Sequence, residues 1–323
     1  TIMDFIECAR DVFDTEIEAL NQTRKALDDT FEKIVRLIIN CGGKVVLCGM
    51  GKSGHIARKI AATFSSLGTP SIFLHPAEAL HGDLGMISSN DVVILLSNSG
   101  ESQEILHILP SIKFIGAETV AITSEKDSTL AKECDYVQII PKVKEACALN
   151  LAPTSSTTAV LAYGDALAVA ISNYHHFTEK DFAVFHPEGA LGKKILIRVE
   201  DIMAKGEDMP VVKEGCKISD AIIEMSKKGL GVVAIVDKYG KLEGLLTDGD
   251  LRRAIEKKIN MYDDIINHVM TKNPKWIIKD MLAAEALQRL KKMSLNNYPV
   301  VDTDMYVIGV LTWQQIIKAG IML

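Results

Sequence analysis

Residues 49–54, with the sequence GMGKSG, form a glycine-rich turn that could hold an anion. They follow an apolar run (45–48) and precede a stretch with helical spacing (56–65). This order predicts a strand, a turn and the start of a helix, whose free N–H groups attract anions. Glycine also lets the backbone approach a ligand closely. We therefore expect Gly51, Lys52 and Ser53 to contact an anionic group.

A dinucleotide is the alternative ligand, because this turn matches the G-x-G-x-x-G fingerprint. That interpretation requires an acidic residue at the end of the second predicted strand (71–74), where it would bind a ribose hydroxyl. His75 and Pro76 follow that strand instead. The Walker pattern fails as well, because it needs a longer spacing before its Gly-Lys pair. The turn therefore favours a compact phosphate.

Two more turns, both rich in hydroxyl groups, follow in the chain. Residues 97–102 (SNSGES) come after the third predicted strand (92–96), and residues 154–158 (TSSTT) open a long helical stretch (155–172). Each turn could act only as a helix cap. If all three turns lie at the same edge of a sheet, they form one phosphate site. The predicted contacts in these two turns are Ser97, Asn98, Ser99, Ser102, Thr154, Ser155, Ser156 and Thr157.

The rest of the first half supplies the elements that position the turns. Helical stretches separate the apolar runs, which predict five strands at 45–48, 71–74, 92–96, 119–122 and 136–140. This alternation predicts an α/β fold with a doubly wound parallel sheet, which binds ligands at the carboxyl ends of its strands. Residues 2–40 predict a helical hairpin that packs on this sheet or on a partner subunit. The stretch at 155–172, rich in Ala and Val, predicts a buried helix.

The second half of the chain contains an internal repeat. The sequence GLLT at 244–247 recurs as GVLT at 309–312, and Ala221 recurs as Ala286 at the same spacing. A repeat of this kind means two copies of one small unit. Each copy predicts a strand, an amphipathic helix, two strands and a helix. We therefore predict three domains, at 1–197, 198–261 and 262–323.

Composition excludes several classes of protein. The chain of 323 residues has a net charge of −6 and no long basic run, so nucleic acid is not an expected partner. No apolar stretch reaches the roughly 20 residues that span a membrane, and no signal peptide precedes Met3. We expect a cytoplasmic protein with no membrane partner. The six cysteines form no C-x-x-C pair, which argues against a disulfide framework or a zinc knuckle.

The three turns resemble the sugar isomerase (SIS) domain, a Rossmann-like module that binds phosphosugars. The repeat resembles a tandem pair of CBS domains, which are small adenosyl-ligand or regulatory modules, and the two resemblances together cover the whole chain. More narrowly, several segments resemble the SIS isomerases that interconvert D-ribulose 5-phosphate and D-arabinose 5-phosphate. These segments are 49–55, 81–86, 97–102, 144–147, 151–158 and 164–168. The resemblance implies the same aldose–ketose isomerisation through an enediol-type intermediate, as the first step toward Kdo and lipopolysaccharide.

The implied reaction needs a base for a carbon-bound proton, a group that stabilises an oxyanion, and a proton shuttle between oxygens. The family's active-site positions are matched by Lys52, His81, Glu104, Glu145 and His186. We expect Lys52 to bind phosphate or stabilise the oxyanion, Glu145 to remove the carbon proton, and Glu104 to orient the substrate. The two histidines suit proton transfer because imidazole titrates near neutral pH. The base stays open among Glu145, Glu104 and His186, because either carboxylate could instead be a solvated or dipole-complementing group.

His186 implies a partner subunit. It lies in a segment that in SIS proteins usually completes a neighbour's site, so the resemblance implies a dimer. We expect a homotetramer built from such dimers through the CBS pairs. The reaction is expected to require no metal or other cofactor, although His75, His81 and His186 could form an inhibitory metal site.

One copy of the repeat carries a ligand signature. Residues 244–250 (GLLTDGD) resemble the ribose-contacting signature of CBS domains, with Thr247 and Asp250 as the polar contacts. Gln315 stands at the acidic position of the second copy. The resemblance implies a regulatory nucleotide or nucleotide sugar at the pair, and a module that only assembles the oligomer is the alternative.

Two other functions stay open at this point. A non-catalytic sugar-phosphate sensor needs only the phosphate turns. SIS regulators carry a DNA-binding motif, however, and the N-terminal helices here are acidic. An isomerase of another phosphosugar is the second alternative, although the stand-alone hexulose-phosphate isomerases generally lack a CBS tail. A biosynthetic and a catabolic setting both stay open.

Overall fold

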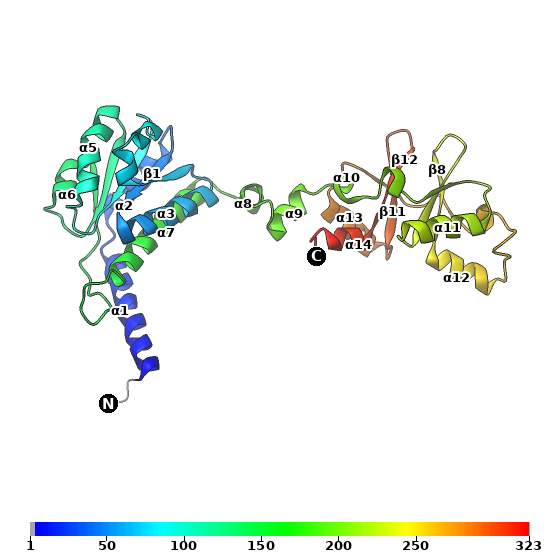
Figure 1. Ribbon diagram of the computed structural model, residues 1–323, viewed down its shortest axis with the longest axis horizontal. Helices are drawn as coiled ribbons and strands as arrows, with labels where there is room; N and C mark the ends of the chain where they lie inside the picture. Colours follow the sequence, from blue (N-terminus) through cyan, green and yellow to red (C-terminus); the bar gives the residue numbers. More distant parts are fainter. Residues whose placement is uncertain (1–3, 323) are drawn as a thin grey trace. The chain divides into compact units, whose positions relative to one another are not determined.

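The computed structural model describes residues 4–322 and divides into two compact units, Thr1–Phe182 and Ala183–Leu323 (Figure 1). The first unit contains the sheet and the three predicted turns, and the second contains the repeat. The predicted domain boundaries at residues 197 and 261 stay predictions. Among the helices within residues 4–322, none combines the length and the apolar character needed to cross a bilayer.

A five-stranded sheet forms the centre of the first unit. Its order is β2-β1-β3-β4-β5, and every neighbouring pair is parallel. The strands are β1 (Val45–Gly49), β2 (Ser71–Leu74), β3 (Val92–Leu96), β4 (Glu118–Thr123) and β5 (Tyr136–Ile139). β1 and β3 are buried at every position, as expected for parallel strands covered on both faces. The doubly wound parallel fold predicted from the sequence is confirmed.

Helices cover both faces of this sheet. The first unit contains α1 (Phe5–Lys25), α2 (Asp29–Ile39), α3 (Gly51–Ser66), α4 (Pro76–Ala79), α5 (Gln103–Ile115), α6 (Thr129–Glu133) and α7 (Ser155–Tyr174), with the 3-10 helix η1 (Asp83–Met86). Val45 and Leu47 of β1 pack in one core with α2, α3 and α7. Val46 and Cys48 pack in a second core with α4, α5 and α6. Successive residues of β1 therefore alternate between the two cores, as the period of a strand requires.

One expectation about helix burial needs correction, and another stays open. Both helices of the predicted hairpin, α1 and α2, are present and pack on α7, but Phe5, Phe13 and Ile17 of α1 are 76%, 71% and 51% exposed in the single chain. Packing of this face on a partner subunit stays a prediction. The expectation of a buried α7 is only half right, because Val169 and Tyr174 are exposed. A helix that covers one face of a sheet buries a single stripe.

The start of α3 differs from the prediction of a free turn at 49–54. The helix begins at Gly51, so Lys52 and Ser53 lie in its first turn. Gly54 allows this arrangement, because a Cβ atom there would stand only 2.6 Å from the carbonyl oxygen of Gly49. The N-terminus of α3 therefore packs against the end of β1, which brings its free N–H groups to the carboxyl edge of the sheet.

The second unit contains two small sheets, one for each copy of the repeat, with orders β6-β7-β8-β9 and β10-β11-β12. The strands are β6 (Val211–Lys213), β7 (Val232–Val236), β8 (Leu242–Thr247), β9 (Thr271–Lys272), β10 (Ile277–Ile278), β11 (Asn297–Val301) and β12 (Val307–Thr312). From α8 onward the helices are α8 (Glu179–Phe185), α9 (Ala190–Leu196), α10 (Val199–Ile202), α11 (Ile218–Lys228), α12 (Asp248–Glu256), α13 (Ala283–Lys292) and α14 (Trp313–Lys318), with η2 (Gly206–Asp208) and η3 (Ile266–His268). The antiparallel pairs β7·β8 and β11·β12 share the same register irregularity, which confirms the repeat.

Equivalent methionines interlock the two copies. Met203, at the start of the first copy, packs on Gly309 of the second, and Met270 packs on Gly244 of the first. A Cβ atom on either glycine would collide with the methionine sulfur. Close approach therefore explains why glycine begins both GLLT and GVLT.

Asp91 joins the starts of β1 and β3. Its side chain is 1% exposed and accepts hydrogen bonds from the backbone N–H of Lys44 (2.9 Å), from Lys44 Nζ (2.8 Å) and from the backbone N–H of Ser88 (2.8 Å). Burial alone raises the pKa of this carboxyl. The hydrogen bonds from Lys44 and Ser88 outweigh burial and hold the pKa below its usual value.

Replacing Asp91 by Asn should lower the free energy of unfolding at pH 7 by about 2–3 kcal/mol, because buried donors then face an amide. A lowered pKa means that the carboxylate stabilises the fold fully above about pH 4 and progressively less as the pH falls through the folded-state pKa. Urea unfolding at pH 7 and in acid measures both effects. The difference between the two proteins should shrink in acid, and a difference that grows there contradicts this explanation.

Candidate active site

Residues of all three predicted turns line one small cavity at the carboxyl edge of the sheet. Its volume is about 40 Å³, far below the roughly 300–1,000 Å³ of pockets that hold larger ligands. The lining residues are Ser53, Ser97, Asn98, Thr123, Ser156 and Thr157, with Ile56, Leu96, Ile122, Ile140, Pro153 and Val160. The three turns therefore meet at one place, and a compact group suits this cavity better than a dinucleotide.

Hydroxyl pairs hold the second turn. Ser97 Oγ lies 2.8 Å from Ser102 Oγ, and the backbone N–H of Gly100 donates to Ser97 Oγ (3.1 Å). Ser99 is exposed, and its Oγ accepts a hydrogen bond from the backbone N–H of Glu101 (3.2 Å). Ser97 is buried and lines the cavity, whereas Ser99 and Ser102 lie outside its lining.

Thr123, at the end of β4, is a lining residue that the sequence prediction missed, and so is the contact of the next residue, Ser124, with Asn98. Thr123 lines the cavity. The carbonyl oxygen of Asn98 accepts hydrogen bonds from Thr123 Oγ1 (3.1 Å) and Ser124 Oγ (2.8 Å). The signal for them was present in the sequence, because two hydroxyl residues directly follow an apolar run at the carboxyl end of a parallel strand.

Glu145 caps the start of α7. Its carboxylate accepts hydrogen bonds from the backbone N–H (2.7 Å) and Oγ1 (2.9 Å) of Thr154, from the backbone N–H of Ser156 (3.3 Å) and from Ser156 Oγ. Burial alone raises the pKa of Glu145, but these hydrogen bonds outweigh it and hold the pKa below its usual value. A carboxylate held in this way is a weaker proton acceptor than a free one. The structure adds a capping role, and the role of Glu145 as the carbon base stays a prediction.

Thr154 and Ser155 position the third turn. Thr154 Oγ1 accepts a hydrogen bond from the backbone N–H of Ala146 (2.9 Å) while it donates to Glu145. Ser155 is fully buried, and its hydroxyl has no hydrogen-bond partner among residues 4–322. Neither side chain lines the small cavity, unlike Ser156 and Thr157.

Lys52, Glu104 and His81 are open to a substrate. Lys52 is exposed in the first turn of α3, Glu104 is half-buried in the first turn of α5, and His81 is exposed after α4. In the described part of the chain, none of the three side chains makes a hydrogen bond or an ion pair. Gly51 lines a neighbouring cavity of about 100 Å³. The catalytic roles of the three side chains stay predictions.

The three histidines of the predicted inhibitory metal site lie on separate elements. His75 is the N-cap of α4, where its Nδ1 accepts a hydrogen bond from the backbone N–H of Ala77 (3.3 Å). His186 lies in the second unit, directly after α8. Among residues 4–322 no three His, Cys, Asp or Glu side chains gather closely enough to hold a metal ion. The inhibitory metal site and the contribution of His186 to a neighbour's site stay predictions.

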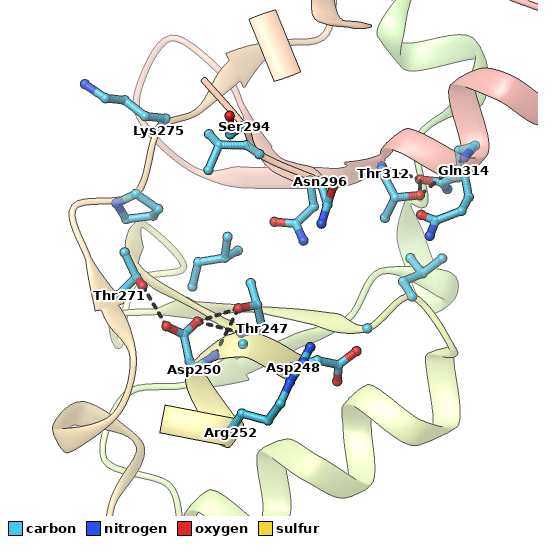
Figure 2. A pocket seen from close by; sticks show the side chains of 18 of the residues that line it. Thr247, Asp248, Asp250, Arg252, Thr271, Lys275, Ser294, Asn296, Thr312 and Gln314 are labelled. Carbon is cyan, nitrogen blue, oxygen red and sulfur yellow. Dashed lines mark hydrogen bonds between the residues drawn. The ribbon is translucent and has the colours of Figure 1, made fainter. Parts of the chain in front are cut away.

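The second unit contains a much larger cavity of about 1060 Å³ between the two copies of the repeat (Figure 2). Thr247 and Asp250 line it. Asp250 Oδ2 accepts hydrogen bonds from the backbone N–H and Oγ1 of Thr247 (both 2.8 Å), and Oδ1 accepts from Thr271 Oγ1 (3.1 Å) and from Arg253. The protein itself thus engages both carboxylate oxygens, so the ribose contact predicted for Asp250 requires one of these donors to leave.

A parallel sheet with three hydroxyl-rich turns at its carboxyl edge, followed by a pair of small α/β modules, is the architecture expected of a phosphosugar-binding domain joined to a tandem pair of small modules. The model of the SIS domain family matches residues 37–170, and the model of the CBS domain family matches residues 199–257 and 265–321. Both resemblances found in the sequence are therefore confirmed.

The chain belongs to the arabinose 5-phosphate isomerase family. It is 45% identical to arabinose 5-phosphate isomerase KdsD of Pseudomonas aeruginosa, over 99% of this chain and 98% of that protein. It is 46% identical to the protein of the same name from Francisella tularensis, over 97% and 96% of the two chains. A solved structure from E. coli CFT073, in complex with arabinose 5-phosphate, is 46% identical with a TM-score of 0.56, and the match covers 58% of this chain and 100% of that chain.

Proposed function

We propose that the first unit interconverts D-ribulose 5-phosphate and D-arabinose 5-phosphate. One observation carries the proposal: three hydroxyl-rich turns meet at one small cavity in a chain whose full-length relatives are named arabinose 5-phosphate isomerase. The hydroxyl groups of Ser97, Ser156 and Thr157 bind the phosphate there, because charge-assisted hydrogen bonds to phosphate oxygens are strong. Ser156 Oγ then leaves Glu145, and Thr157 Oγ1 leaves the carbonyl oxygen of Thr154.

The chemistry moves one proton along the sugar. In the aldose-to-ketose direction a base removes the proton from C2, the carbonyl oxygen at C1 gains a proton, and an enediol-type intermediate forms. A proton then returns to C1 as the C2 hydroxyl loses its proton. Glu145 is the proposed base, Lys52 stabilises the developing oxyanion, and the imidazole of His81 or His186 transfers protons between oxygens.

Relatives named as isomerases support an enzyme rather than a sugar-phosphate sensor or an isomerase of another phosphosugar. Incubation with D-ribulose 5-phosphate, followed by chromatography of the sugar phosphates, tests the choice. D-arabinose 5-phosphate is the expected product. No turnover, or D-ribose 5-phosphate as the sole product, would contradict the proposal.

Replacing Ser97 by Ala should raise the KM for D-ribulose 5-phosphate about tenfold or more, because a hydrogen bond to a charged group is lost. The effect on kcat should be smaller, because phosphate binding serves the ground state and the transition state alike. Steady-state kinetics measure the split. Ser111→Ala, on the exposed surface of α5, is the control and should leave KM within about twofold. A Ser97→Ala protein with the parent KM would remove this hydroxyl from the phosphate site.

The finer features of the function are also proposals. The product feeds the synthesis of Kdo and lipopolysaccharide, and the enzyme works in the cytoplasm as a homotetramer. The exposed apolar face of α1, with Phe5, Phe13 and Ile17, supports subunit contact. Isomerisation requires no metal or other cofactor in this proposal, because Lys52 and hydrogen-bond donors can stabilise the oxyanion.

The large cavity of the second unit binds a regulatory nucleotide or nucleotide sugar in this proposal. Its volume of about 1060 Å³ and its lining by charged and amide side chains support a ligand of that size and polarity. A pair that only assembles the oligomer would need no such cavity.

A further inference from the structure

The large cavity has two walls that come from equivalent parts of the repeat. The polar side chains of the first wall are Thr247, Asp248, Asp250, Arg252 and Arg253, and those of the second wall are Thr312, Gln314, Gln315 and Lys318. Figure 2 shows Thr247, Asp248 and Asp250 on one side of the cavity and Thr312 and Gln314 on the other. The two walls have equivalent backbone structures. Differences between their side chains therefore indicate which ligand groups each wall can bind.

Asp250 and Gln315 have the same structural role in the two copies of the repeat. Asp250 Oδ2 accepts hydrogen bonds from the backbone N–H and Oγ1 of Thr247 (both 2.8 Å). Gln315 Oε1 accepts the equivalent bonds from the backbone N–H (2.8 Å) and Oγ1 (3.1 Å) of Thr312. Each residue thus completes a capping box at the start of its helix. The cap needs an acceptor oxygen, which either a carboxylate or an amide supplies.

The remaining polar atom of the two side chains differs in kind. Asp250 keeps a second acceptor oxygen, already engaged by Arg253 and by Thr271 Oγ1 (3.1 Å). Gln315 keeps an amide nitrogen, a donor of two hydrogen bonds, which has no partner within residues 4–322. The second wall therefore presents a free donor where the first wall presents a satisfied acceptor.

The net charge of the two walls also differs. The first wall has two cations: Arg253 is paired with Asp250, and Arg252 has no ion pair with any described residue. Lys318 of the second wall has no ion pair with any described residue. The exposed carboxylate of Asp248, also unpaired in that part of the chain, has the indole of Trp313 as its counterpart in the repeat. The second wall thus has amide donors and a cation but no acid, whereas on the first wall the carboxylates of Asp248 and Asp250 balance its two cations.

We propose that the second wall binds the phosphate groups of a nucleotide and that Gln315 selects for them. Phosphate oxygens accept hydrogen bonds from the amides of Gln314 and Gln315 and pair with Lys318. Hydroxyl groups of the same ligand donate to Asp248 across the cavity. This inference rests on the nucleotide site proposed above and adds the orientation of the ligand and the side chain that sets it.

Isothermal titration of the full-length chain with ATP, adenosine and inorganic tripolyphosphate tests the proposal. ATP and tripolyphosphate should bind, and adenosine should bind at least about tenfold more weakly than ATP. Gln315→Glu keeps the acceptor that caps α14 but places a negative charge on the second wall. It should weaken ATP and tripolyphosphate about 10- to 100-fold and leave adenosine unchanged.

Gln288→Glu is the matched control, because Gln288 is exposed on α13 and lies outside the cavity lining. The same chemical change there should alter ATP affinity by no more than about twofold. Lys318→Gln is a second variant on an exposed side chain, should Gln315→Glu fail to fold, and it should weaken ATP about tenfold.

Three results would overturn the proposal: no binding of any probe at millimolar concentration, equal loss of ATP affinity in Gln315→Glu and Gln288→Glu, or adenosine binding as tight as ATP. The last result would overturn phosphate selection but leave the nucleotide site standing. Turnover of D-ribulose 5-phosphate by the same preparation separates these failures from failure of the proposed isomerase.

Discussion

Replacing Glu145 by Gln should lower kcat by about 100- to 10,000-fold and the free energy of unfolding by about 1–3 kcal/mol. The loss of rate follows from the proposed role as carbon base. The loss of stability follows from the cap, because an amide NH₂ then faces donors on Thr154 and Ser156 that now reach a carboxylate. Steady-state turnover and thermal unfolding of the same preparation measure the two effects separately.

Glu104→Gln is the matched comparison, because Glu104 makes no hydrogen bond or ion pair with any residue from 4 to 322. Its free energy of unfolding should stay within about 0.5 kcal/mol of the parent. If Glu104 only orients the substrate, its kcat should fall about tenfold. Parent-like turnover in Glu145→Gln would remove Glu145 as the base, and a larger loss in Glu104→Gln would reassign that role to Glu104.

Replacing Gly54 by Ala should destabilise the first unit by about 2 kcal/mol and raise the KM for D-ribulose 5-phosphate. The new Cβ atom would stand 2.6 Å from the carbonyl oxygen of Gly49. Backbone atoms move less readily than side chains, so the overpacking should cost about 3 kcal/mol. The better helix propensity of alanine returns only about 1 kcal/mol. The N-terminus of α3 must then move away from β1, which carries Ser53 out of the cavity lining.

Gly85→Ala controls for the loss of a glycine as such. Nothing stands within 4 Å of a Cβ atom built on Gly85, and its φ is not positive. Urea unfolding should give a value within about 0.5 kcal/mol of the parent. Equal destabilisation in the two variants would mean that the contact between Gly54 and Gly49 does not matter.

Buried parallel strands were the easiest part of the fold to predict. The bounds predicted for β2 and β3 agree with the structure, because an apolar run between turn residues has few other uses in a βαβ pattern. The repeat was equally visible, since it depends on sequence identity alone. The start of α3 was not predicted, because Gly51 and Gly54 discourage a helix by propensity. Only the close approach of Gly54 to Gly49 of β1 explains the helix there.

The sequence predicted which residues belong to the candidate site better than it predicted how they contact one another. The residue pattern placed Ser97 at the end of a strand and Ser156 at the start of a helix, and the structure brings both to one cavity. The capping of α7 by Glu145 was missed, because it depends on how the loop after β5 returns to the helix start. For the same reason the sequence could not show that Asp250 is already engaged by Thr271, which lies on another strand.

The most direct test of the isomerase is the fate of one hydrogen atom. D-ribulose 5-phosphate is incubated with the protein in D₂O, and the product is analysed by NMR. A base that exchanges its proton with solvent should yield D-arabinose 5-phosphate with deuterium at C2. Formation of no D-arabinose 5-phosphate, or of D-ribose 5-phosphate alone, would contradict the proposed isomerisation.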